Sequence, residues 1–178
     1  MKQRTADSLI KLFNELFSDN LNTILVRGED EPIYLPADDQ HPQHRIIFAH
    51  GFFASALHEI SHWCVAGDQR RLLIDFGYWY KPDGRSAAEQ AEFEQVEIKP
   101  QALEWLLSVA AGHKFHFSAD NLGANMGASD SFKENVHQQV MRYLNEGLPE
   151  RPAQLIQTLQ AYYGTSPLTP ALFSLQDK

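Results

Sequence analysis

The chain has 178 residues, 43% of them hydrophobic and 21% charged, and its formal net charge at pH 7 is −8. This length suits one domain with a proper core, here expected over 1–178, and the composition excludes a wholly disordered chain. The acidic balance, with no basic cluster beyond Gln69-Arg70-Arg71, argues against direct binding of nucleic acid. The single cysteine, Cys64, excludes an internal disulfide and a cysteine-based zinc site.

Two features indicate a protein that works in the cytoplasm without a membrane partner. The apolar run over 106–111 is far too short to span a bilayer, and the N-terminal stretch lacks the uninterrupted apolar core of a signal peptide. A lone thiol also fits a reducing compartment. We therefore expect a soluble, cytoplasmic protein.

The first third of the chain predicts a helix followed by short strands. Apolar residues from Leu9 to Phe17 recur at helical spacing, and Thr5 or Asp7 is a suitable cap. After this helix we expect strands over 23–26, 32–35 and 45–49, a loop over 36–44, and a helix over 52–66 that Gly67 ends.

The remainder predicts mainly helices. We expect a strand over 72–80, a turn at 82–84, a helix from Ser86 and a separate helix from Pro100 to Ala111. A short strand or loop over 115–118 and a loop over 119–130 should follow. The last two expected elements are a helix capped by Ser129 or Asp130 and ending at Asn145, and a helix from Pro152 to Tyr163. Helices dominate and the strands cluster early. The pattern predicts an α+β domain with helices packed on a small, mostly antiparallel sheet.

The segment His58-Glu59-Ile60-Ser61-His62 is an H-E-x-x-H pattern on a predicted helix. Residues four apart lie on one face of a helix, so both imidazoles reach a single metal ion. Glu59 projects beside that face, where it can take a proton from metal-bound water. Two histidines with ordinary structural partners are the alternative reading of the same pattern.

A third protein ligand is needed, and carboxylates are the main candidates. Glu94, Glu97, Gln101 and Glu104 recur at spacings of three, four and three, which places them on one face if the stretch is helical. We favour Glu97, which sits among apolar residues, and place Glu94 second. A solvated acidic face remains the alternative for this run, and His50 or another histidine remains an alternative ligand.

Two histidines and one carboxylate support two different reactions. With zinc, Glu59 would act as general base in peptide hydrolysis. With iron(II), the same ligands leave positions for dioxygen and substrate, as in an oxygenase. A purely structural metal is a third reading, disfavoured because structural zinc sites are usually closed and rich in cysteine.

Several segments taken together match one known family. They are His58-Glu59-Ile60-Ser61-His62-Trp63-Cys64, Asp75-Phe76-Gly77-Tyr78-Trp79-Tyr80, Pro82-Asp83-Gly84-Arg85, Val96-Glu97, Lys99-Pro100-Gln101-Ala102-Leu103, Asp120-Asn121-Leu122, Pro149-Glu150-Arg151-Pro152 and Tyr162-Tyr163. Over nearly its whole length, the chain resembles the bacterial elongation factor P hydroxylase family.

This resemblance implies a non-haem iron enzyme that hydroxylates the β-lysylated lysine of elongation factor P, with dioxygen as co-substrate. It implies iron(II) held by His58, His62 and Glu97, with zinc as the alternative metal. No basic pocket for 2-oxoglutarate is identifiable, so the sequence does not name the electron source.

The substrate that the resemblance implies carries extra positive charge. We expect Glu94 and Glu104 to attract that charge. Tyr78 belongs to an aromatic stretch that would form an apolar wall along the methylenes of the substrate.

Overall fold

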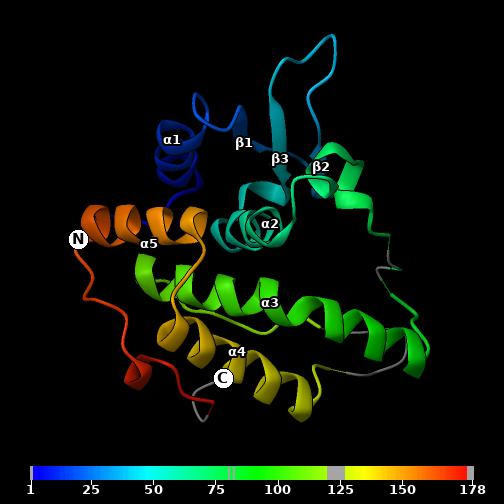
Figure 1. Cartoon of the computed structure of the whole chain (residues 1–178), viewed down its shortest axis with the longest axis vertical. Coiled ribbons are helices and arrows are strands. Elements are labelled where there is room, and N and C mark those ends of the chain that lie inside the picture. Colours follow the sequence, from blue (N-terminus) through cyan, green and yellow to red (C-terminus); the bar gives the residue numbers. More distant parts are fainter. Residues whose placement is uncertain (1, 80, 82, 120–126, 176–178) are drawn as a thin grey trace.

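The computed structural model describes residues 2–79, 81, 83–119 and 127–175, and within them it has the predicted α+β architecture (Figure 1). The helices and strands are α1 (Ala6–Phe17), β1 (Thr23–Arg27), β2 (Ile33–Leu35), β3 (His44–Phe48), α2 (Phe53–Val65), α3 (Ala87–Ala111), α4 (Asp130–Glu146) and α5 (Glu150–Tyr163). Short 3-10 turns occur at Ala49–Gly51 (η1), Arg70–Leu72 (η2), Ile74–Gly77 (η3) and Pro170–Leu172 (η5).

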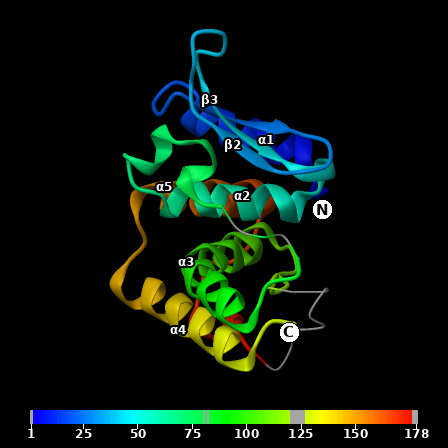
Figure 2. The ribbon, with the colours of Figure 1, turned by 90° about the vertical axis from the view of Figure 1, so that its right-hand side faces the viewer.

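The elements form layers, which Figure 2 shows from the side. The sheet and α1 lie at one end, α2 and α5 lie in the middle, and α3 and α4 lie at the other end. Accordingly, α2 contacts both β3 and α3, and α3 contacts α4 and α5 as well. Among the described helices none is both long enough and apolar enough to cross a bilayer.

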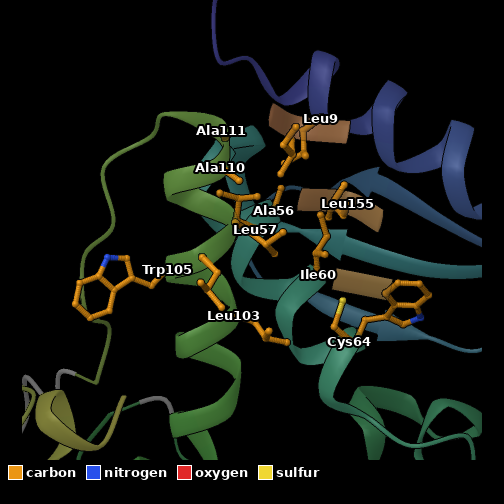
Figure 3. Close-up of a cluster of buried hydrophobic side chains, with 14 of the residues drawn as sticks. Leu9, Ala56, Leu57, Ile60, Cys64, Leu103, Trp105, Ala110, Ala111 and Leu155 are labelled. Atoms are coloured by element: carbon orange, nitrogen blue, oxygen red, sulfur yellow. The ribbon is translucent and has the colours of Figure 1, made fainter. Parts of the chain in front are cut away.

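Helix α2 is buried on most of its circumference. Figure 3 shows its Leu57 and Ile60 between Leu103 of α3 and Leu155 of α5, and all four side chains are buried. On another face, Trp63 packs on the α1 residue Phe13, with ring centroids 5.2 Å apart. Burying a side chain of this size stabilises the fold by about 1.5–3 kcal/mol. This packing holds α2 against α3. The candidate metal-site residues lie where these two helices meet.

The sheet is mixed rather than mostly antiparallel. Its strand order is β1-β3-β2, with β2 and β3 antiparallel but β1 and β3 parallel. Thr23 pairs with His44 in the parallel ladder, and Ile33 pairs with Ile47 in the antiparallel one. Parallel neighbours need a long connection, and here the segment from 28 to 43, which includes β2, provides it.

The strand expected over 72–80 is wrong for the described part, residues 72–79. The chain instead makes η2 and η3, in which Asp75 and Phe76 adopt left-handed backbone angles (φ 47° and 58°). Asp75 Oδ1 accepts a hydrogen bond from the backbone N–H of Tyr34 at 2.8 Å, and Phe76 stacks on the Tyr34 ring at 4.2 Å. These contacts with β2 stabilise a turn whose apolar residues otherwise have the composition of a strand.

Pro100 does not start a helix, because it lies inside the continuous helix α3. Proline lacks the N–H that would bond to the carbonyl four residues earlier, and for this reason the sequence predicts a break there. The C-terminal half of α3 is buried almost all round, and this packing outweighs the lost bond. Residues 115–118 form no strand. Tyr80, Pro82 and most of the expected loop over 119–130 lie outside the described residues.

Candidate metal site

The two histidines of the H-E-x-x-H pattern lie one turn apart on α2, as their spacing predicts. The Nε2 atoms of His58 and His62 are 3.2 Å apart. Both side chains are only partly buried. The face of α2 that carries the two histidines is directed toward α3.

Glu97 of α3 faces this pair. Its Oε1 lies 2.9 Å from His62 Nε2, and its Oε2 lies 3.8 Å from His58 Nε2. A metal bonded at about 2.1 Å sets neighbouring ligand atoms about 3.0–3.4 Å apart. The observed separations bracket that range, so the three side chains fit a metal ion. Among the described residues, this is the one group of three or more His, Cys, Asp or Glu whose ligand atoms lie within 4.8 Å of one another.

Two further residues of α3 hold His58 and Glu97 in place. Glu104 Oε2 lies 2.7 Å from His58 Nδ1, so the proton of the neutral imidazole is on Nδ1 and Nε2 faces the cluster. Gln101 Nε2 donates to Glu97 Oε2 at 3.1 Å and to the backbone oxygen of Ser118 at 3.0 Å. The backbone N–H of Ser118 donates back to Gln101 Oε1 at 3.1 Å. The helical spacing of 97, 101 and 104 placed Gln101 on this face, but its role in holding Glu97 was not anticipated.

The cluster strongly perturbs its own protonation in the metal-free state. Burial alone would lower the pKa of His58, but the Glu104 and Glu97 carboxylates outweigh it and raise that pKa to about 10. Burial alone would raise the pKa of Glu97, yet His62 and His58 lower it to about 2. The pKa of His62 is raised as well, because Glu97 outweighs its burial. Protons thus occupy the positions that a cation would take.

Glu59 lies beside the cluster and takes no part in these contacts. Its carboxylate makes no hydrogen bond or ion pair with the described residues. Burial raises its pKa above the ordinary value, against the lowering effect of His58 and His62. A carboxyl with a raised pKa and no protein partner is suited to exchanging a proton with a bound reactant.

The other site candidates lie close by with different contacts. Glu94 accepts hydrogen bonds from the N–H and the hydroxyl of Ser129, at the start of α4. The guanidinium of Arg70 covers one face of the Tyr78 ring, 4.0 Å from its centroid. Tyr78 and Arg70 border a small pocket of about 200 Å³ that His62 also lines. Tyr78 and His62 thus line the same pocket.

Comparison with known proteins matches the chain to one family. The family model described as "Elongation factor P hydroxylase" matches residues 12–173. A curated protein from Haemophilus influenzae (strain ATCC 51907 / DSM 11121 / KW20 / Rd), named "Elongation factor P lysine hydroxylase", is 55% identical over 159 residues. The match covers 89% of this chain and 89% of that protein. The family match spans both helices that carry the cluster.

Proposed function

The chain belongs to the elongation factor P hydroxylase family, and on that premise we propose that it hydroxylates the β-lysylated lysine of elongation factor P. The observation that carries the proposal is the group of His58, His62 and Glu97 on two rigidly packed helices. Two histidines and one carboxylate form the ligand set typical of non-haem iron(II) oxygenases. The setting we propose is the cytoplasm.

We propose that His58 Nε2, His62 Nε2 and the Glu97 carboxylate hold iron(II). When bound, iron(II) supplies the dioxygen chemistry that hydroxylation needs. Glu104 orients His58 through Nδ1 and Gln101 orients Glu97, so the ligands are arranged before the metal arrives. We propose this orienting role for Glu104 in place of the attraction of the substrate's positive charge that the sequence suggests.

Glu59 is proposed to handle protons. Converting a C–H bond into C–OH with dioxygen releases the second oxygen atom as water, which takes up two protons and two electrons from a reductant. The Glu59 carboxyl, with its raised pKa and no protein partner, can deliver a proton beside the cluster. Tyr78 is proposed to contact the methylenes of the substrate side chain at the pocket edge.

The experiment measures the intact mass of β-lysylated elongation factor P after incubation with the iron-loaded protein, oxygen and a reductant. We expect a gain of one oxygen atom with the wild type and none with His62→Ala. His41→Ala, in an exposed loop outside the cluster, is the matched control and should retain activity. Fe(II) binding is measured on each variant in parallel.

The result that would contradict the proposal is an unchanged mass with the β-lysyl group confirmed and iron bound. Cleaved peptide bonds in the presence of zinc, abolished by Glu59→Gln, would instead favour the zinc peptidase reading, in which Glu59 is the general base.

A further inference from the structure

The segment beside the pocket exposes large apolar side chains. Leu72, Leu73, Ile74 and Trp79, here called the apolar lip, are 61%, 49%, 60% and 81% exposed. Soluble proteins rarely gather exposed apolar side chains, and where they do, the patch commonly binds another protein. Trp79 is the most exposed of the large hydrophobic residues that the structure describes.

The lip is held in place by the turn between its two parts. Asp75 and Phe76 adopt left-handed backbone angles that cost free energy in residues other than glycine. The contacts of Asp75 and Phe76 with Tyr34 offset this cost, and Arg70 Nη1 donates to the Phe76 oxygen at 2.9 Å. Phe76 is buried, whereas the lip residues on either side of the turn are exposed. The fold thus orders a segment whose apolar side chains remain largely uncovered by the described part of the chain.

The same segment borders the pocket at His62. Phe76 and Tyr78 line that pocket from η3 and its end, together with Val96 and Pro100 of α3. A protein that delivers a lysine side chain to His62 therefore has its surface next to the lip.

A larger groove of about 510 Å³ adjoins the pocket, since Val65, Tyr78 and Val96 line both. The groove runs between α3 and α4 and contains Lys99 and Arg142. Within the described part of the chain, neither cation has an ion pair or a side-chain hydrogen bond. In a chain with a net charge of −8, two cations without acidic partners in one groove suit carboxylates from another molecule.

We propose that the apolar lip and this cationic groove together form the docking surface for the protein that carries the target lysine. The inference rests on the proposed function. The partner presents apolar side chains to the lip and acidic side chains to Lys99 and Arg142, while its modified lysine enters the pocket between them.

The test compares two substrates: β-lysylated elongation factor P and a short peptide that carries the same modified lysine. In Ile74→Ser/Trp79→Ser we expect KM for the protein to rise at least tenfold with little change in kcat. KM for the peptide, which is too short to cover the lip, should change less than twofold. The matched control is Leu172→Ser, a 46% exposed residue of η5, which lies far from η3 (Figure 1).

The groove is tested by charge reversal. Lys99→Glu/Arg142→Glu should raise KM for the protein substrate at least tenfold at low salt and weaken its dependence on NaCl. Lys11→Glu on α1, at the other end of the molecule, is the charge-reversal control. Thermal unfolding and Fe(II) binding of every variant are measured to exclude misfolding.

A direct binding measurement distinguishes the proposed docking surface from the proposed function. Calorimetric titration of elongation factor P into each protein needs no turnover. If the wild type turns over and both sets of variants bind as tightly as it does, the docking surface is overturned and the proposed function stands. If the wild type neither binds nor modifies elongation factor P, both fail.

Discussion

At the scale of single residues, Glu104 decides which nitrogen of His58 faces the cluster. Its carboxylate lies 2.7 Å from Nδ1, which leaves Nε2 directed at Glu97 and His62. Carboxylate partners of this kind also make the imidazole a better electron donor to a metal. The position and the basicity of His58 thus depend on Glu104, which is not itself a proposed ligand.

We predict that Glu104→Gln lowers iron(II) affinity roughly 10–100-fold, because the amide retains the size but loses the charge that orients His58. Affinity is measured by competition with a chelator. Glu94→Gln is the control, since Glu94 lies on the same helix and bonds to Ser129 instead. Equal losses in both variants would show that general acidity, and not the bond to His58, supports metal binding.

At the scale of elements, local patterns predicted the helical positions of the candidate ligands better than they predicted the segments around them. The i, i+4 spacing of His58 and His62 and the spacing from Glu97 to Glu104 are properties of a helix, which a sequence displays directly. The structure brings Glu97 to the histidines. The sequence favours Glu97 for its helical spacing and its apolar neighbours, and the family resemblance implies the same residue.

The failures occurred where distant residues decide the local structure. The 72–79 segment has a strand's composition, and its turn depends on Tyr34, about forty positions earlier. Pro100 remains helical because α3 packs against three other helices. The mixed sheet likewise depends on where β1 lies, which no strand pattern specifies.

The junction of α3 and α4 yields a prediction at this scale. Ser129 caps α4 by accepting from the Phe132 N–H at 3.1 Å, and its hydroxyl donates to Glu94 at 2.7 Å. Ser129→Ala should lower the free energy of unfolding by about 1–2 kcal/mol, as expected for a lost N-cap. Urea unfolding measures this loss, and metal affinity should change less than twofold.

Gln157→Ala, at an exposed position of α5, provides the comparison and should stay within about 0.5 kcal/mol of wild type. A double-mutant cycle of Ser129→Ala with Glu94→Gln isolates the contact between the helices. A coupling energy of zero would mean that the cap acts within α4 alone.

At the scale of the whole molecule, the cluster makes stability depend on pH. The folded pKa of His58 is about 10, above its unfolded value, so its contribution is complete below about pH 6.5 and is lost as pH rises toward 10. Glu97 has a folded pKa of about 2, so its contribution is complete above about pH 4.5 and is lost as pH falls toward 2. The site therefore stabilises the metal-free fold most between these limits.

We predict that the unfolding free energy of the metal-free protein falls by roughly 1–3 kcal/mol between pH 6.5 and 8.5. Burial lowers the pKa of His44 and of His113, so their unfolded imidazoles bind protons that the folded ones do not, and they add a small opposite slope near pH 6.5. Burial raises the pKa of Cys64 to about 12, so the unfolded thiol, which ionises near pH 8.5, adds to the fall only at the upper end of the window. His58 and His62, whose raised pKa values act in the same direction, account for most of the slope.

Bound iron(II) should remove most of this slope. The metal requires deprotonated ligands, so the loaded protein no longer holds the protons that the metal-free site binds, and its stability should stay nearly level over this pH range. Urea unfolding at several pH values, with a chelator and with anaerobic iron(II), measures both slopes. His58→Gln should reduce the metal-free slope and weaken iron(II) binding, because it removes the main proton site and one ligand together. Parallel slopes in the two series would mean that protons and metal do not compete for the same atoms, and that the cluster is not the metal site.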